Sequence, residues 1–316
     1  MKPQPSSVFR VQGYFDEFVA GLLRRVSLEQ ETVCLTPPLS LMRFLPFFLA
    51  LFCFTSLSAL LADQKAPKIK PGVRSSIQFT ESTPQSSAAQ LKLRMRSSDD
   101  PGPYDLSRES FQILVPRGYK ESEPHGLFVW ISAGDQPSIS ADWEKTLADQ
   151  KLIFIGAVNS GNKRPVFDRI RLAVDANHHV RQLYNIDANR VYISGHSGGS
   201  RVASMMGVAY ADMFTGAACF MGVNFFMPTQ GKDGTMFEAR YVPHLEIASI
   251  AQQQNRFALI TGDKDFNRDN TQAIYEQGFV ANQFKGVKLF DIPNQGHNAP
   301  SKEWLEKVLQ FLDTGK

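Results

Sequence analysis

Short apolar runs alternate with longer amphipathic segments from Tyr104 to the C-terminus. The runs are nearly continuous in apolar and β-branched residues, as expected of strands that are covered on both faces. They span residues 111–116, 126–132, 152–158, 190–194, 216–223, 256–262 and 287–293. Apolar residues recur at helical spacing in the intervening residues 141–150, 167–184, 199–210, 269–284 and 301–312. The pattern predicts an α/β fold for residues 104–316, a mostly parallel sheet with helices on both faces.

An uncharged stretch stands out nearer the N-terminus. Residues 44–62 carry no charged side chain, follow directly on Met42 and Arg43, and end in small residues. This arrangement predicts a signal peptide over residues 42–62, and therefore a secreted or periplasmic protein. A stretch of 19 uncharged residues can also span a bilayer, so we expect membrane contact only if the segment stays uncleaved.

The residues on either side of this segment have less pattern. Residues 1–41 are interpreted as a leader or an over-extended start, because a signal peptide normally begins a chain. Residues 63–103 are rich in Ser, Pro and Lys, and SSIQFTES at 75–82 is their only strand-like piece. We expect residues 63–103 to form a linker or a loosely docked arm.

Charge and cysteine content exclude several classes of partner. The chain has 34 basic and 31 acidic residues, a balance that argues against a nucleic-acid partner, whose phosphates need many cations. The cysteines Cys34, Cys53 and Cys219 lack the paired spacing of a metal or redox site. His178 and His179 have no acidic or cysteine partner at ligand spacing. The sequence therefore predicts neither a metal nor a cofactor.

The fourth apolar run leads into the motif Gly195-His196-Ser197-Gly198-Gly199. This is a G-x-S-x-G motif between a predicted strand and a predicted helix, where the glycines permit a sharp turn. Such a turn pushes the serine hydroxyl clear of the sheet. Ser197 is therefore the candidate nucleophile, and the alternative is a tight turn with an idle serine.

A serine nucleophile needs a base and an acid that orients the base. Both are expected on loops after later strands, in the order Ser, acid, His. His297 follows the last predicted strand and is the candidate base, whereas His244 precedes every well-placed acid. The loop after residues 256–262 offers two acids, and we favour Asp265 over Asp263, which abuts the strand end and would bond loop amides.

Ester cleavage also needs hydrogen-bond donors for the developing oxyanion. The backbone N–H of Gly198, at the start of a helix, is one candidate donor. The second should come from the loop ISAGDQ, from Gly134 or Asp135, although Gly134 is also explained as a plain turn glycine. Phe225 and Phe226 follow the strand beside the nucleophile and are candidates for substrate binding, with core packing as the alternative.

Several motifs together resemble the α/β-hydrolase superfamily, and within it the secreted polyhydroxybutyrate-depolymerase-like and feruloyl-esterase-like branch. They are IDANRVYISGHSGGSRVASMM, TGDKDFNR, QGHNAP, and VPRGY followed by LFVWISAG. The loop ISAGD lacks the His-Gly pair of many relatives. The resemblance implies an α/β-hydrolase fold and hydrolysis of small or polymer-derived esters through an acyl-enzyme carried by Ser197, Asp265 and His297.

Two further expectations concern the presence of a lid and the class of reaction. Residues 224–255 are too few for a large lid domain, so we expect an open site. A serine peptidase or other acyl hydrolase on the same fold, and a non-catalytic hydrolase-like binding protein, are the competing hypotheses.

Overall fold

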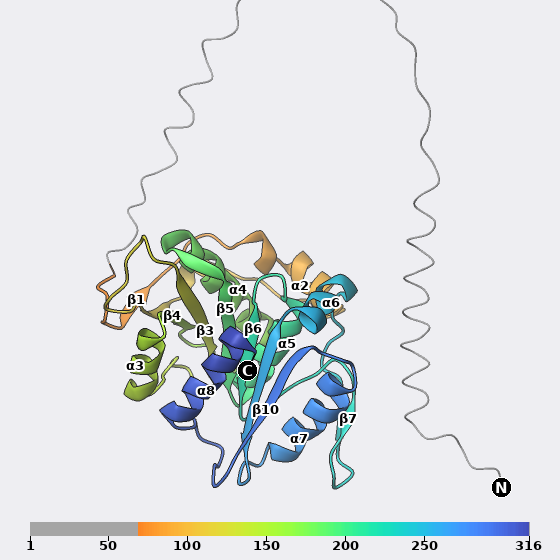
Figure 1. The fold of residues 1–316 in the computed structure, drawn as a ribbon. Coiled ribbons are helices and arrows are strands. Elements are labelled where there is room, and N and C mark those ends of the chain that lie inside the picture. The colour runs from red at the N-terminus through yellow and green to blue at the C-terminus, as the bar shows by residue number, and fades with distance from the viewer. Residues whose placement is uncertain (1–68, 316) are drawn as a thin grey trace, which may run out of the picture. The chain divides into compact units, whose positions relative to one another are not determined.

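The computed structural model describes residues 69–315 and centres on one twisted sheet (Figure 1). The predicted leader 1–41 and signal peptide 42–62 lie outside the described residues. The eight strands of this sheet are β1 Ser75–Ile77, β2 Phe111–Leu114, β3 His125–Ile131, β4 Leu152–Ala157, β5 Ile186–His196, β6 Gly216–Phe220, β9 Arg256–Gly262 and β10 Gly286–Ile292.

The strand order is β1-β2-β4-β3-β5-β6-β9-β10. β2 runs antiparallel to β1 and β4, whereas every pairing from β4 to β10 is parallel. Each of the seven predicted apolar runs contains one strand, and the prediction of a mostly parallel sheet is confirmed. A small separate pair, β7 Thr229–Gln230 and β8 Met236–Phe237, lies between β6 and β9 in the chain.

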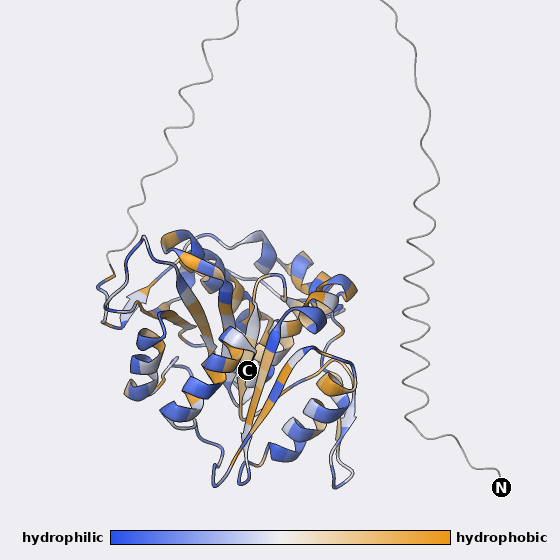
Figure 2. Ribbon diagram, viewed as in Figure 1, coloured by the Kyte–Doolittle hydropathy of each residue, from blue (hydrophilic) through white to orange (hydrophobic). Residues whose placement is uncertain are grey.

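Helices cover both faces of the sheet. The helices are α2 Ala88–Met95, α3 Ala141–Asp149, α4 Val166–Leu183, α5 Gly198–Ala209, α6 Leu245–Gln253, α7 Arg268–Ala273, the π-helix Ile274–Val280 and α8 Lys302–Thr314. Alternate strand residues pack on opposite sides, so Leu127 and Val129 join the cluster with α4 and α5, whereas Phe128 and Trp130 join the cluster with α3 and α8. Figure 2 shows the hydrophobic strands between helices whose outer faces are hydrophilic.

Two helices and one helix type differ from the expectations. α2 and α6 were not predicted from the sequence, since each leaves only a few side chains fully buried. The predicted helix over residues 269–284 is α7 followed by the π-helix. The wider turns occur where Gly278 packs on the Phe225 ring, at a spot where a Cβ atom would lie 2.9 Å from that ring.

The segment expected to be a linker or loosely docked arm is firmly packed over its described part, residues 69–103. β1 pairs with β2, and Ile77, Phe79, Leu91 and Met95 are buried in the cluster that contains α4 and α5. These few large apolar residues anchor a segment whose overall composition is that of a loop. Residues 69–103 therefore form part of the folded unit.

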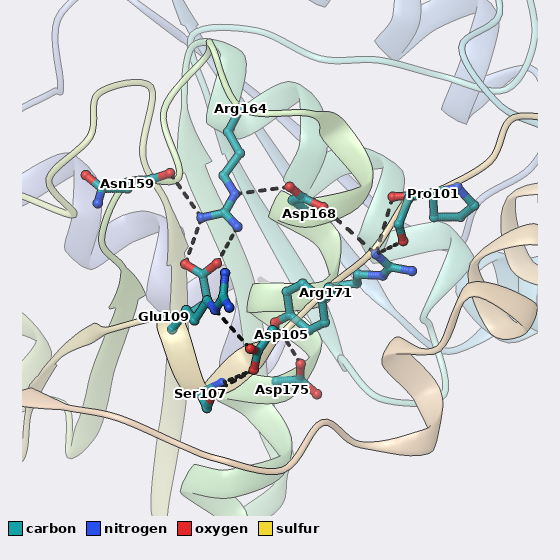
Figure 3. Close-up of polar contacts among 12 residues, drawn as sticks. Pro101, Asp105, Ser107, Glu109, Asn159, Arg164, Asp168, Arg171 and Asp175 are labelled. Carbon is teal, nitrogen blue, oxygen red and sulfur yellow. Dashed lines mark hydrogen bonds and ion pairs between the residues drawn. The ribbon is translucent and has the colours of Figure 1, made fainter.

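Buried polar groups on α4 also hold this segment. The Asp175 carboxylate accepts hydrogen bonds from Thr83 N–H at 2.8 Å, Ser86 Oγ at 2.8 Å and Tyr104 OH at 2.9 Å. Arg171 donates to the carbonyl oxygens of Pro101 and Gly102 (Figure 3). The chain between α2 and β2 is thereby fixed against α4.

A neighbouring ion pair fixes the start of α4. Arg164 bonds both carboxylate oxygens of Glu109, with Nη1 at 2.8 Å from Oε2, and also contacts Asp168 (Figure 3). Paired contacts of this kind are geometrically specific. They hold the loop between β4 and α4, which lies beside the predicted nucleophile. Within residues 69–315, no helix is both long and apolar enough to cross a membrane.

Candidate active site

Ser197 occupies a strained turn between β5 and α5. Its backbone angles are φ 55° and ψ −120°, a conformation that L-residues rarely adopt. The turn is possible because the neighbouring backbone comes very close: a Cβ atom at Gly199 would lie 1.9 Å from the Ile131 carbonyl oxygen. Gly195 is equally constrained, with 2.5 Å to the Gly199 carbonyl carbon. The glycines of the motif are therefore steric requirements of the turn.

The structure brings the predicted base and acid to this serine. His297 Nε2 lies 2.8 Å from Ser197 Oγ, and His297 Nδ1 lies 2.7 Å from Asp265 Oδ1. The three residues follow β5, β9 and β10, whose carboxyl ends lie at one edge of the sheet. The arrangement has the geometry of a nucleophile, a base and an orienting acid.

The loop after β9 distinguishes the two acids that the sequence offered. The Asp265 side chain is fully buried, and it also accepts from Thr261 Oγ1 at 2.9 Å and from the Asn267 N–H at 3.1 Å. Asp263 is exposed, and its backbone N–H donates to the Ile292 carbonyl. The expectation that Asp263 would bond the loop amides does not hold, because Asp265 accepts that bond.

Two aromatic rings that the sequence analysis did not assign flank His297. The Phe266 ring stacks on the imidazole with centroids 3.9 Å apart and is 77% exposed, which makes it the most exposed large apolar side chain between residues 69 and 315. The His196 Nε2 lies 3.0 Å from the His297 carbonyl oxygen. Burial lowers the pKa of His196, and the charge of His297 lowers it further.

The predicted oxyanion donors differ in their surroundings. Gly198 is the first residue of α5, so its N–H has no acceptor within the helix. The Gly134 N–H already donates to Ser132 Oγ at 3.1 Å, and the Asp135 carbonyl accepts from Asn159. The side chain nearest Gly198 is that of Asn162, because a Cβ atom at Gly198 would lie 2.0 Å from Asn162 Oδ1.

Comparison with known proteins identifies the architecture. Neither a family model nor a curated protein sequence matches the chain. Among solved structures, S-formylglutathione hydrolase from Staphylococcus aureus is similar at 11% identity, over 78% of this chain and 98% of that one, with a TM-score of 0.50. The fluorophosphonate-binding serine hydrolase F of the same organism is similar at 13% identity, over 77% and 100%, also with 0.50. Est1E from Butyrivibrio proteoclasticus is similar at 14% identity, over 64% and 91%, with 0.45.

The chain has the α/β-hydrolase fold. The resemblance seen in the sequence motifs implies this fold, and the strand order and the solved structures agree with it. Function on this fold is decided by the residues of the site. Within the hydrolase fold, Ser197 lies at the carboxyl end of a central parallel strand, where such sheets hold their ligands.

Two hollows are lined by residues close to Ser197 in the chain, the larger by Arg201 and the smaller by His196. The larger, of about 900 Å³, is lined by residues from the α2–β2 connection, the starts of α4 and α5, and residues 237–242. The smaller, of about 260 Å³, is lined by Trp130, Trp143, His196 and Ala299 together with the loop after β3. Both hollows are open, and no large lid covers the hydrolase fold within residues 69–315.

The two predicted substrate-binding phenylalanines lie elsewhere. Phe225 is buried in the hydrophobic core, where its ring contacts Phe279 and Phe284. Phe226 packs on Phe225 and Tyr241 at the border of the same cluster. Neither lines the hollows of about 900 and 260 Å³, and both pack in or against the core, the alternative left open by the sequence. Phe225 also lines a small hollow of about 80 Å³ with Arg201 and Asn224.

The remaining candidates are also accounted for. His244 is the N-cap of α6, and its backbone N–H donates to Arg94. His179 Nε2 contacts the Glu81 carbonyl, and its ring stacks on Phe79. The described part of the chain holds no cluster of side chains suited to a metal ion. Burial raises the pKa of Cys219 to about 12, which makes this thiol unreactive.

Proposed function

We propose that the protein is a serine hydrolase that cleaves carboxylic esters through an acyl-enzyme intermediate. The observation that carries the proposal is the continuous hydrogen-bonded chain from the buried Asp265 through His297 to Ser197. The strained backbone of Ser197 supports it, because strain of this kind is kept where function requires it. The motifs that resemble polyhydroxybutyrate-depolymerase-like and feruloyl-esterase-like enzymes favour small or polymer-derived esters.

In the acylation step, the Ser197 hydroxyl attacks the ester carbonyl carbon while His297 Nε2 takes the hydroxyl proton. Asp265 accepts from His297 Nδ1–H and so keeps the basic nitrogen facing the serine. The carbonyl oxygen becomes an oxyanion, and the Gly198 N–H at the start of α5 is placed to stabilise it. The imidazolium then protonates the leaving alkoxide, which leaves an ester of Ser197.

Deacylation repeats these steps with water as the nucleophile. His297 Nε2 takes a proton from a water molecule as its oxygen attacks the acyl carbon. The proton returns to Ser197 Oγ as the new acid leaves. Each proton passes through the same imidazole nitrogen, so His297 is required in both half-reactions.

Turnover of a short-chain aryl ester, 4-nitrophenyl butyrate, tests this proposal. Ser197→Ala and His297→Ala should each lower kcat by roughly three to six orders of magnitude, because nucleophile and base act as one unit. His244→Ala is the matched control and should retain wild-type rates. Near-wild-type activity of His297→Ala, in protein shown to be folded by circular dichroism, would contradict the proposed chemistry.

We further propose that the protein is exported and processed near the end of residues 42–62, so that it acts in the periplasm or outside the cell. The uncharged run and its small terminal residues support this. Mass spectrometry of the exported protein should place its first residue close to position 63. Recovery of peptides from residues 1–41 on the exported protein would refute processing, and membrane attachment would then follow.

A further inference from the structure

The larger hollow begins one helical turn from the proposed nucleophile. Arg201 follows Ser197 by four residues and donates its backbone N–H to the Ser197 carbonyl at 3.0 Å. Residues four apart lie on the same side of a helix, with an axial rise of about 6 Å. Arg201 and Met205 both line the hollow of about 900 Å³. The wall of the hollow therefore starts within one helical turn of Ser197.

Three arginines line this hollow: Arg96, Arg201 and Arg240. Within residues 69–315 none of them forms an ion pair with a carboxylate. The guanidinium of Arg201 donates instead to neutral acceptors, the Val223 carbonyl and the side-chain oxygens of Asn224 and Asn267. The guanidinium is thus held in place by neutral acceptors.

The arginines also influence one another. Burial lowers the pKa of Arg201, the positive charge of Arg240 lowers it further, and the Asp265 carboxylate raises it in part. The two neighbouring cations repel each other, and a bound anion relieves that repulsion. Asp99 and Asp100 line the hollow as well, on the exposed turn after α2, where Asp100 Oδ1 accepts from the Gly102 N–H. The lining still has one more cation than anions.

The placement of the two hollows assigns the two parts of an ester. The leaving alcohol has to face His297, which protonates it. The smaller hollow contains His196, the neighbour of Ser197 in the chain, and Ala299, two residues after His297, and so suits the leaving group. The acyl part then extends into the larger hollow, whose walls include the apolar side chains of Phe167 and Met205.

We propose that this hollow selects acyl groups that end in a carboxylate, which Arg201 and Arg240 bind. The inference rests on the proposed ester hydrolysis, whose substrate class it specifies. An acyl chain with four methylene groups separates its two carboxyl carbons by about 6 Å, which matches the axial rise from Ser197 to Arg201 at the start of α5. Arginine suits this role because its planar guanidinium matches a carboxylate and stays charged.

A matched pair of substrates tests the selection. The mono-4-nitrophenyl ester of adipic acid and 4-nitrophenyl hexanoate share a six-carbon acyl chain, and only the first ends in a carboxylate. We expect kcat/KM to be at least about tenfold higher for the adipate ester, mainly through KM, since one charged contact of about 1.4 kcal/mol gives that factor. The preference should shrink in high salt, which screens charges in an open hollow.

Variants of one arginine show where the preference arises. Arg240→Gln should lower the ratio of the two kcat/KM values severalfold, and Arg240→Lys should retain part of it, because a lysine keeps the charge but not the planar geometry. Arg117→Gln removes an exposed arginine outside the hollow and should leave the ratio at its wild-type value. Equal kcat/KM values for the two esters, or a preference that Arg240→Gln leaves intact, would overturn the inference.

Calorimetric titration separates this inference from the proposed function. Adipate should bind to the Ser197→Ala protein more tightly than hexanoate, and adding Arg240→Gln should weaken adipate alone. Adipate binding in a protein that hydrolyses no ester would contradict the proposed function but not the anion site. Ester hydrolysis without any difference between adipate and hexanoate binding would contradict the anion site but not the proposed function.

Discussion

At the scale of single residues, the imidazole of His297 is positioned by an acid that is itself held in place. The Asp265 carboxylate receives hydrogen bonds from His297, Thr261 and Asn267, and its side chain is fully buried. Three donors hold this buried carboxylate in one orientation. The orientation of the imidazole therefore depends on the packing of the whole loop after β9.

The first prediction compares the two aspartates of this loop. Asp265→Asn should lower kcat for 4-nitrophenyl butyrate by roughly ten-thousandfold while the fold persists, because the imidazole loses its orientation and charge support. Asp263→Asn should stay within about threefold of wild type, since an exposed side chain outside special contacts has little effect. Steady-state kinetics on both variants checks this, and the opposite ranking would show that Asp263 is the acid.

The second prediction concerns His196 and pH. Because burial holds its pKa below the unfolded value, the unfolded chain binds this proton more readily. The contribution of His196 to stability is therefore present above about pH 6.5, the usual value for histidine, and is lost as the pH falls. Urea unfolding at pH 7.5 and 5 should show a smaller acid-induced loss for His196→Gln than for wild type. Identical losses would exclude this role.

At the scale of elements, the backbone at the start of α5 packs directly on the backbone at the end of β3. Gly199 lies against the Ile131 carbonyl, so no side chain fits between the helix start and β3. The turn after β3 tolerates more, since a Cβ atom at Gly134 would have one neighbour within 4 Å, Ser132 Oγ at 3.9 Å. Glycines on the two sides of the site thus have different roles.

The third prediction uses this contrast. Gly199→Ala should destabilise the protein by about 3 kcal/mol or more, because backbone atoms would have to move to admit the methyl group. Gly134→Ala should change stability by less than about 1 kcal/mol, because space is available there. Urea midpoints of both variants measure the difference. A Gly199→Ala protein as stable as wild type would contradict the steric explanation of the motif.

The sequence predicts the elements in which buried apolar residues recur regularly over many positions. Each strand from β2 to β10 that belongs to the main sheet overlaps an apolar run, because strands in the middle of such a sheet are buried on both faces. α2 has little such signal, since only Leu91, Arg94 and Met95 of its residues are buried. The docking of residues 69–103 depends on contacts distant in sequence, which local patterns do not reveal.

The same limit applies to the site. The sequence predicts Ser197 from its motif and His297 from its order in the chain. It predicts Asp265 as the acid, with Asp263 as the alternative. Asn162 and Phe266 were not predicted. Each lies on a loop and comes near the site only because of the direction in which its side chain points. For Phe225 the sequence left core packing open, because an aromatic residue after a buried strand packs into the core as readily as it lines a pocket.

At the scale of the whole molecule, the order of the strands assembles the site. Residues separated by 100 positions, Ser197 and His297, meet because β5 and β10 end at the same edge of the sheet. The chain before β2 borders the larger hollow and docks on α4 through Asp175. The docking of residues 83–104 therefore shapes one wall of the larger hollow.

The fourth prediction tests this docking. Asp175→Ala should destabilise the protein by about 3 kcal/mol, because it leaves the Thr83 N–H and the Tyr104 hydroxyl without an acceptor. Glu121→Ala alters an exposed carboxylate and should cost less than about 0.5 kcal/mol. Urea unfolding with limited proteolysis should show cleavage of residues 83–104 before the rest. An unchanged midpoint would mean that this segment adds little to stability.

The most direct test of the central claim is covalent labelling of the serine. Purified protein is incubated with a fluorophosphonate probe, digested and mapped by mass spectrometry. We predict a single modified residue, Ser197, with no label on Ser197→Ala and much slower labelling of His297→Ala, whose serine lacks its base. Absence of label from folded wild-type protein, or label on another serine, would contradict the account.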